Sequence, residues 1–256
     1  MSRVVLLVLL VLAPGVARAQ IVNVQGALAK QPEKDGVIGQ LEAKLDWRAG
    51  NNPLFDVGGA ANVLVRRGNL LGLAIVRGEY GRGSGNTFKR KTFEHARVRA
   101  ALDCRWRWEA FTQHELDGFR RLVVRALAGT GPALQIVDVP AISALAGAAY
   151  LIEYERLDER DGVPDAGARG TAHRGSFYVT ATQKIGGTTA LNQTVYIQPR
   201  LDEPGDVRLF AELSVTSKIS ERVALSQAFV GAYDRRPPAE IERYDTQLRF
   251  SVLLTL

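Results

Sequence analysis

Charged and polar side chains recur at every second position in several parts of this 256-residue sequence. The stretch Gln40–Asp46 alternates polar with small or apolar residues, and His95, Arg97 and Arg99 repeat the pattern with a basic row. Because successive side chains of a β-strand point to opposite faces, this spacing places each charged row on one face of a strand. Rows of opposite charge on neighbouring strands can form ion pairs, or a constriction that selects small solutes.

The candidate site residues share one property: each lies on the polar face of an expected strand, and we expect that face to line the interior of a barrel. They are Arg77, Glu79, His95, Arg97, Arg99, Glu109, Gln113, Glu115, Arg121, Arg125, Glu153 and Glu155. Two interpretations of this polar lumen stay open. Its charges can be structural, satisfying one another across strands, or they can form a constriction of mixed charge. The structural interpretation is favoured, because interior charge is the default in such barrels.

A lipid-hydrolysing site on the outer rim is a remote alternative. His114 lies in the apolar phase of its strand, and Glu94 and Thr112 share that face. A hydrolase needs a nucleophile within hydrogen-bond reach of its base, and no serine lies on the strands around His114. We therefore expect no enzymatic activity. No His, Cys or carboxylate cluster has a ligand spacing, so we expect neither a metal nor a cofactor.

Long strands are the elements expected to position these residues. Alternating hydropathy predicts twelve of them, near 37–48, 55–67, 70–80, 90–102, 105–117, 121–134, 142–156, 173–184, 189–200, 206–218, 222–234 and 244–256. Strands of soluble proteins average about 5 to 6 residues, whereas membrane-crossing strands need about 9 to 11. Connections after odd-numbered strands are mostly long and those after even-numbered strands mostly tight, as in outer-membrane barrels.

The apolar phase of these strands is expected to face lipid. A closed ring of twelve strands is too wide for side chains to fill, since about eight strands is where they suffice. Aromatic residues near the strand ends favour lipid exposure, because membrane barrels carry two aromatic girdles. These residues are Trp47, Tyr80, Tyr154, Tyr233 and Tyr244 at the outer ends and Trp106 and Trp108 at the inner end. The competing interpretation is a soluble periplasmic β-sandwich that binds a ligand.

The first nineteen residues have the three-part layout of a secretory signal peptide. Arg3 precedes an apolar run that ends at Ala13, a Pro-Gly break follows, and Ala17-Arg18-Ala19 matches an A-x-A cleavage site. We expect residues 1–19 to be removed, residues 20–36 to form a short periplasmic lead, and residues 37–256 to form one barrel domain. Cys104 is the single cysteine, so no internal disulfide is expected.

Charge and the end of the chain indicate the expected partners. The formal net charge of +6 becomes +4 when Arg3 and Arg18 are removed, and no basic cluster interleaved with aromatic residues suggests nucleic acid. The last strand alternates to the end of the chain, although Leu256 departs from the terminal aromatic residue with which exported barrels commonly finish. We expect contacts with outer-membrane lipid, recognition of this strand by the barrel-assembly machinery, and small solutes in a conducting lumen.

Several stretches resemble one bacterial family. They are GQLEAKLDWRAGNN, RGEYGR, FEHARVR, EAFTQHELDGFRRLVVRALAGTGPAL, AYLIEYERLDER and YIQPRLDEPGDVRLFAELSVTSKIS. Over residues 21–256 the chain resembles the salt-induced outer membrane proteins, a domain family of unknown function. The resemblance implies an outer-membrane β-barrel but no reaction and no catalytic residue.

The expected fold is therefore all-β, a single closed antiparallel transmembrane barrel of about 12 strands in the bacterial outer membrane. The expected role is structural and stress-related, or that of a narrow pore for small solutes.

The signal-peptide assignment predicts that the exported protein begins at Gln20. Intact-mass measurement of protein extracted from membranes should give the mass of residues 20–256. Replacing both alanines of the cleavage site, Ala17→Leu with Ala19→Leu, should block processing, because the site requires small residues. Wild-type protein that retains residues 1–19 in the membrane fraction would contradict the assignment.

Overall fold

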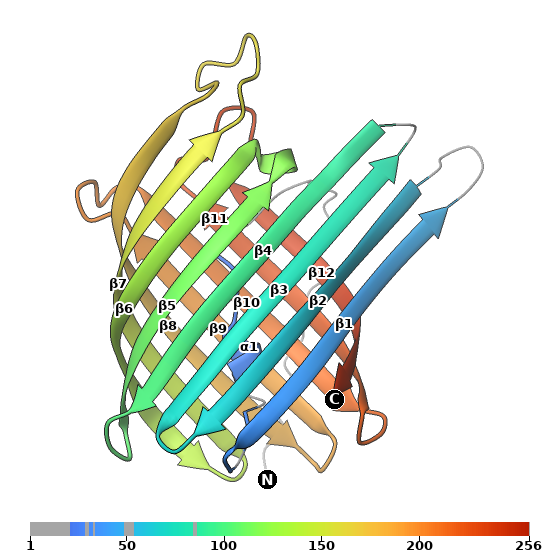
Figure 1. The fold of residues 1–256 in the computed structure, drawn as a ribbon, viewed down its shortest axis with the longest axis vertical. Coiled ribbons are helices and arrows are strands. Elements are labelled where there is room, and N and C mark those ends of the chain that lie inside the picture. Colours follow the sequence, from blue (N-terminus) through green and yellow to red (C-terminus); the bar gives the residue numbers. More distant parts are fainter. Residues whose placement is uncertain (1–20, 29–30, 33, 49–53, 84–85, 256) are drawn as a thin grey trace, which may run out of the picture.

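A closed antiparallel barrel forms the body of the computed structural model, which describes residues 21–28, 31–32, 34–48, 54–83 and 86–255 (Figure 1). Every strand pairs with its neighbours in sequence, and the first pairs with the last. Within the described ranges the strands are β1 (Gly36–Arg48), β2 (Leu54–Arg67), β3 (Leu70–Gly83), β4 (Asn86–Ala101), β5 (Trp106–Asp117), β6 (Leu122–Val139), β7 (Ile142–Leu157), β8 (Arg169–Ile185), β9 (Thr189–Pro199), β10 (Val207–Lys218), β11 (Val223–Asp234) and β12 (Tyr244–Thr255). The expected fold class and the twelve strands are confirmed.

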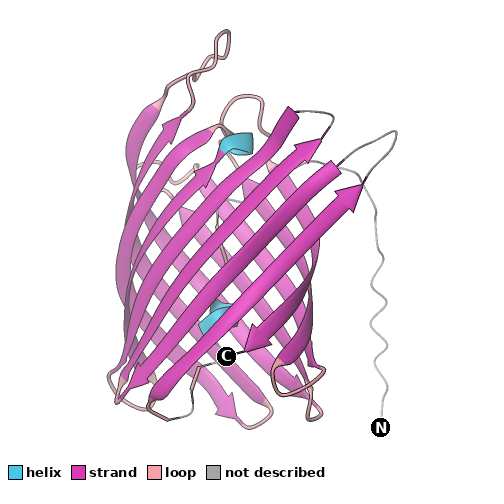
Figure 2. Cartoon of the chain, turned by 45° about the vertical axis from the view of Figure 1, so that its right-hand side comes forward, coloured by secondary structure: helices cyan, strands magenta, loops and turns pink. Residues whose placement is uncertain are grey.

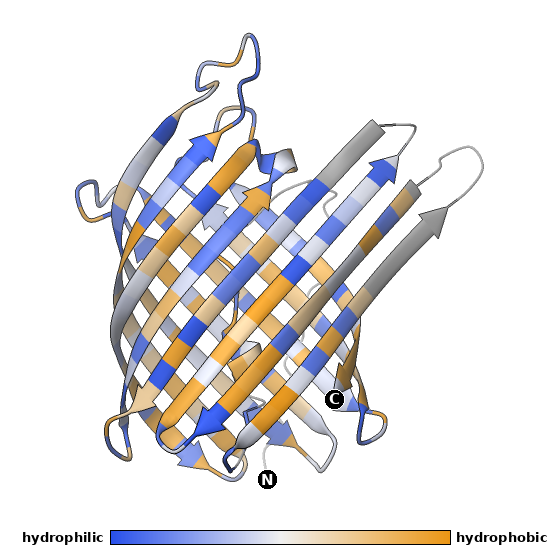
Figure 3. Ribbon diagram, in the orientation of Figure 1, coloured by the Kyte–Doolittle hydropathy of each residue, from blue (hydrophilic) through white to orange (hydrophobic). Residues whose placement is uncertain are grey.

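Side chains alternate between the two faces of the wall as the sequence predicts. On β4, His95, Arg97 and Arg99 are buried, whereas Val98 between the two arginines is 50% exposed. The bands of opposite hydropathy along the front strands show this alternation in Figure 3. An outer face so rich in exposed Val, Leu, Ile and Phe exceeds the apolar patches of water-soluble monomers. It matches the apolar band of a membrane barrel.

The two ends of the barrel differ in the length of their connections. Tight turns close one end, and the turn between β2 and β3 consists of Gly68 and Asn69, with Gly68 at φ +58°. That left-handed conformation costs glycine little because it has no Cβ. Longer connections span 158–168, 200–206 and 235–243 at the other end. The connection after β3 is shorter than predicted, because β3 reaches Gly83 and β4 resumes at Asn86.

The seam between β1 and β12 is much shorter than the other strand pairings. It pairs Gln40–Ala43 with Val252–Thr255, whereas β1 pairs with β2 along its whole length. Among the described side chains, the Ser251 hydroxyl donates a hydrogen bond to the Glu42 carboxylate across the seam. Closure of the ring therefore depends on the inner ends of the first and last strands.

Residues 21–28 enter the barrel and lie in its lumen. They include α1 (Gln25–Leu28), which Figure 2 shows inside the lower part of the barrel. The expectation of a periplasmic lead over 20–36 is therefore wrong for 21–28. The physical reason is that Ile21, Val24 and Leu28 find apolar partners on the inner wall and are nearly fully buried there. Among the described residues, no helix is long and apolar enough to cross a membrane.

The inner wall that receives this segment is apolar on two opposite sides. Val24 and Leu28 pack against a group on β2, β3 and β4, and Ile21 packs against a group on β6 to β11. The first group is Leu64, Leu71, Leu73, Ile75 and Phe93, and the second is Ala133, Leu145, Tyr178, Tyr196, Phe210 and Val230. These side chains would face water in an empty lumen, so packing against residues 21–28 stabilises both the segment and the wall.

The register of the seam predicts where a disulfide can close it. Ala43→Cys with Val252→Cys, in a Cys104→Ala background, should crosslink because these positions face each other across β1 and β12. Oxidation should raise the midpoint of the heat-dependent gel shift relative to the reduced protein, with a stabilisation of roughly 2–4 kcal/mol. Leu41→Cys with Val252→Cys is the matched control, displaced by two residues along β1. Equal crosslinking of both pairs would show that the seam does not hold this register.

Candidate functional site

A buried carboxylate on β5 is the centre of a polar cluster in the lumen. Arg97 Nη1 lies 2.9 Å from Glu109 Oε2, and Arg99 Nε lies 2.5 Å from Glu109 Oε1. The Tyr178 hydroxyl of β8 donates to Glu109 Oε2 over 2.8 Å. Tyr178 can reach across because its ring lies over Gly147, where an added Cβ would come within 2.2 Å of the ring. The contact between Tyr178 on β8 and Glu109 on β5 thus needs glycine on β7, one of the two strands between them.

Gln25 of α1 extends this cluster to the opposite wall. Its Oε1 accepts a hydrogen bond from Arg99 Nη2 at 3.1 Å, and its Nε2 donates to the Tyr196 hydroxyl at 3.0 Å. Arg99 belongs to β4 and Tyr196 to β9, which lie five strands apart in the ring of twelve. Beside them, Asn23 Nδ2 donates to Glu212 Oε1 over 3.1 Å. Residues 21–28 therefore cross the lumen, and we call them the plug segment.

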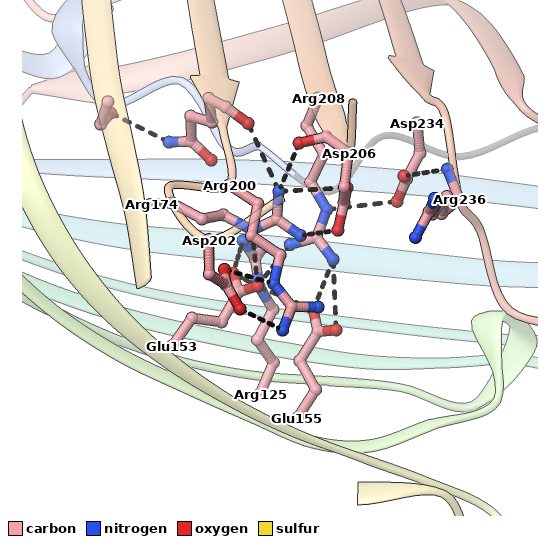
Figure 4. A network of polar contacts seen from close by, with 12 residues as sticks. Arg125, Glu153, Glu155, Arg174, Arg200, Asp202, Asp206, Arg208, Asp234 and Arg236 are labelled. Atoms are coloured by element: carbon pink, nitrogen blue, oxygen red, sulfur yellow. Dashed lines mark hydrogen bonds and ion pairs between the residues drawn. The ribbon is translucent and has the colours of Figure 1, made fainter. Parts of the chain in front are cut away.

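Glu153 on β7 is the centre of a second cluster, nearer the long connections (Figure 4). Among the described residues its carboxylate contacts three guanidinium groups: that of Arg125, that of Arg174 at 3.2 Å and that of Arg208 at 2.6 Å. Glu153 itself is 1% exposed. Such a buried charge is tolerated only when its partners satisfy it, and here three strands, β6, β8 and β10, supply them.

The arginines around Glu153 are themselves neutralised by further carboxylates. Arg174 pairs with Asp206 at 2.9 Å, and Arg208 pairs with Asp234 at 3.2 Å and with Glu155 at 3.1 Å. Asp206 and Asp234 lie at the outer ends of β10 and β11, so the network joins strands β6 to β11 along one wall. We call the residues around Glu153 the outer network: Arg125, Glu153, Glu155, Arg174, Asp206, Arg208 and Asp234.

Glu115 connects the outer network to β4 and to η1 (Gly118–Arg120). Arg125 Nη1 lies 3.5 Å from Glu115 Oε2, while Lys91 Nζ and Arg120 Nη1 lie 3.3 Å and 3.6 Å from Glu115 Oε1. The Asp117 carboxylate caps η1 by accepting from the backbone N–H groups of Phe119 and Arg120. This cap fixes the rim where β5 turns into β6.

Arg121 does not lie on the lumen face of a strand, where the sequence predicted it. It precedes β6 in a left-handed conformation with φ 62°, and it binds the connection after β7 rather than the lumen wall. Its guanidinium contacts Asp158 at 2.8 Å and also Asp165. Burial alone would raise the pKa of Asp165, but the Ala239 N–H and the Arg121 guanidinium hold that pKa below its ordinary value. Arg121 thus anchors two outer connections.

The remaining candidates line the lumen at other positions. His95 is buried between the rings of Phe93 and Phe111, with centroids 6.1 Å from each, and Gln113 is buried beside it. Arg77 and Glu79 border a small cavity with Glu42, Gly59, Ala60, Gln247 and Arg249 on the side of the seam. The structure therefore places the candidates in several clusters rather than in one ring.

Little space remains between these clusters. The cavity beside His95 and the cavity beside Arg77 each have a volume of about 30 Å³, which leaves room for no more than a few water molecules. A larger vestibule of about 330 Å³ opens above the outer network and includes Glu155, Asp165, Arg174, Arg200, Arg208 and Arg236 in its lining. A charged vestibule therefore lies above the two small cavities of the described lumen.

Most expected girdle residues face outward at the predicted ends. Tyr80 and Tyr154 are exposed toward the long connections, and Trp106 and Trp108 are exposed toward the tight turns. Tyr244 is exposed and stacks on Tyr233 at 5.0 Å, whereas Tyr233 itself is half-buried. The side chain of Trp47 lies outside the residues described. The positions are those of two aromatic belts.

The His114–Glu94 pair forms on the outer face, and among the described residues no hydroxyl or thiol group forms a hydrogen bond to it. His114 Nδ1 lies 2.6 Å from Glu94 Oε2. The Thr112 hydroxyl donates to the Leu127 carbonyl oxygen at 3.2 Å, so its proton is already engaged. The described residues also contain no group of His, Cys, Asp and Glu that could hold a metal ion. The geometry shows an ion pair or hydrogen bond between His114 and Glu94 at this site.

The sequence analysis did not predict the plug segment or four residues of the outer network, Arg174, Asp206, Arg208 and Asp234. Arg174 and Arg208 lie in the same inward phase as the candidates, so the alternation on β8 and β10 could have found them. A signal for the plug segment also exists. On β3, Leu71, Leu73 and Ile75 precede Arg77 in the inward phase, and apolar residues on both faces of a strand indicate protein contact on the lumen side.

Comparison with known families shows to which family this chain belongs. The model of the family described as protein of unknown function DUF481 matches residues 41–256. The chain belongs to this family. None of the curated proteins compared with it matches. The match begins after the plug segment, so residues 21–28 lie outside the matched region.

Solved structures show the same architecture at low sequence identity. A NanC porin is 9% identical, with 86% of this chain and 100% of that chain covered and a TM-score of 0.51. The translocator domain of the autotransporter NalP from Neisseria meningitidis is 12% identical, with 91% of each chain covered and a TM-score of 0.49. At such identity the likeness concerns the fold alone. The chain has an outer-membrane-type β-barrel fold.

The burial of Glu153 predicts a large loss of stability when its charge is removed. Glu153→Gln leaves three guanidinium groups around a neutral amide, so the free energy of unfolding should fall by roughly 3–5 kcal/mol. Urea titration of the barrel refolded in lipid vesicles measures it. Glu155→Gln is the matched control on the same strand. Its side chain is 27% exposed, so its loss should be well under half as large. Equal losses would contradict the central place of Glu153.

Proposed function

We propose that this protein is an integral barrel of the bacterial outer membrane, without enzymatic activity, whose lumen is closed in its resting state and whose role in the envelope is structural and stress-related. The observation that supports it most is the plug segment, which crosses the lumen between β4 and β9. Exposed apolar side chains around the barrel and the two aromatic belts support a location in lipid.

The packing of the plug segment supports a closed state at equilibrium. Val24 and Leu28 are 1% and 2% exposed, so their side chains are removed from water almost completely. Full burial of side chains of this size stabilises by about 1.5–3 kcal/mol each, before the entropy cost of ordering the segment. An open state would expose both side chains and the apolar wall around them.

A narrow pore for small solutes is the second candidate function. The vestibule above the outer network favours it, because carboxylates and guanidinium groups of both signs line its floor and entrance. Conduction would need the plug segment to leave the lumen, since the cavities between the described residues hold about 30 Å³ each. The two candidates therefore differ in whether the plug segment moves.

Partners of the barrel follow from its surface and its last strand. Outer-membrane lipid would cover the apolar face. The barrel-assembly machinery would act on β12, whose seam with β1 is short whereas its pairing with β11 runs along most of the strand. Small solutes would enter the lumen only in the pore alternative. The stress-related part of the role is open to a growth comparison of deletion and wild-type strains at high salt.

Single-channel recording in a planar bilayer tests the closed state. The refolded wild-type protein, verified by its heat-dependent gel shift, should show no discrete current steps. Val24→Asp with Leu28→Asp should give discrete openings, because charges on these side chains cannot stay in the apolar wall. Lys34→Glu is the matched control, since Lys34 is exposed and lies outside the plug segment.

Each result has a distinct meaning for the two candidates. Reproducible steps from the wild-type protein would refute the closed resting state and favour the pore. Silence from the double variant, with the barrel still folded, would show that the plug segment does not close the lumen.

A further inference from the structure

Two arginines lie opposite each other near the outer ends of β7 and β8. The strand register pairs Arg156 with Arg169 directly. Both side chains are exposed, and Arg156 is in the outward phase that alternates with inward Glu153 and Glu155. Arg169 stands where β8 crosses the rim, between the outer face and the vestibule. Like charges facing each other across two strands repel and destabilise the pairing.

These two guanidinium groups differ from the other arginines around them. Arg121, Arg160 and Arg200 each bind a carboxylate of the neighbouring connections, and Arg174 and Arg208 bind the outer network. In the described part of the chain, Arg156 and Arg169 form no such ion pair. Glu155, Asp158 and Asp165 of this region pair with other arginines, so their carboxylates do not neutralise these two positive charges.

Their height on the barrel places them at a lipid headgroup. On the same outward row, Tyr154 lies two residues below Arg156 and Thr171 two residues below Arg169, and these two residues also face each other. One further step down is the pair of Ile152 and His173, followed by exposed Tyr150. Aromatic residues of this kind mark the interface between hydrocarbon and headgroups, so the arginines just above them lie among the headgroups.

We propose that Arg156 and Arg169 form a binding site for the phosphate group of an anionic membrane lipid, which supplies the missing counter-ion. Guanidinium groups present several N–H donors in a planar fork that fits phosphate oxygens. The lipid's acyl chains would lie along the apolar face of β7 and β8 below, beside Ile152 and Tyr150. The site rests on the proposal that the barrel spans the membrane.

Native mass spectrometry of the detergent-solubilised full barrel tests the site, with phosphatidylglycerol and phosphatidylcholine as the probes. The wild-type protein should retain phosphatidylglycerol with a clear preference. Arg156→Gln with Arg169→Gln should weaken that binding roughly ten- to thirtyfold, because each basic residue near a membrane surface contributes about 1 kcal/mol. Arg156→Lys with Arg169→Lys keeps both charges and should keep most of the binding.

The matched control removes two charges elsewhere. Arg67→Gln with Arg222→Gln changes two exposed arginines near the tight turns, which are not neighbours in the register, and should leave the preference unchanged. An equal loss in this control, or no loss in the Arg156/Arg169 glutamine variant, would overturn the site. Complete displacement of the lipid by millimolar inorganic phosphate would also overturn it, since it would identify a free-anion site.

A separate measurement distinguishes failure of the site from failure of the membrane assignment. Every variant is refolded into neutral phosphatidylcholine vesicles and checked by the heat-dependent gel shift. Wild-type barrel that inserts there but shows no preference for phosphatidylglycerol refutes the lipid site alone. Wild-type barrel that does not insert refutes the proposed membrane location, and with it the site.

Discussion

The charged side chains on the strands of this barrel must point into the lumen, and most of the structure follows from that constraint. With an apolar outer face, the charged residues of each strand must turn inward, where water is scarce and each ion needs a partner. Glu109 and Glu153 are buried carboxylates for which this is satisfied, by two and three arginines respectively. Removing one member leaves the others buried without compensation, so these clusters specify the lumen as much as they stabilise it.

Along the barrel axis the lumen has two parts, one lined mainly by ion pairs and the other mainly by apolar side chains. The outer part holds the ion pairs around Glu153 and opens into the vestibule, where water can solvate Glu155 and Arg236. The inner part is walled by aliphatic and aromatic side chains, which would be unfavourable in contact with water. The plug segment resolves that problem by supplying its own apolar side chains. Gln25 then satisfies the polar groups of Arg99 and Tyr196 that lie between the two parts.

Period-2 alternation was sufficient to predict the fold, the number of strands and the inward direction of most charged residues. The alternation is informative because the two faces of a strand in a barrel wall meet different surroundings, the outside and the lumen. Arg97 and Arg99 are buried on the lumen side, and Val98 between them is exposed on the outer face. It could not predict which carboxylate meets which arginine. Arg208 and Glu153 are 55 residues apart and three strands apart, so their contact depends on the curvature of the ring. Nor could a local pattern place residues 21–28, which belong to apolar clusters with residues from nine strands.

The outer network and the plug segment differ in how they cross the lumen, and this difference bears on passage through the barrel. The outer network joins strands β6 to β11, which are contiguous in the ring, so its ion pairs follow one wall. On the opposite wall, Glu42, Arg77 and Glu79 lie beside a small cavity. The hydrogen bonds of Gln25, in contrast, join β4 to β9 and therefore cross the axis. A network along one wall narrows a lumen, whereas a segment across the axis divides it, so the proposed closed state would depend on the plug segment rather than on the ion pairs.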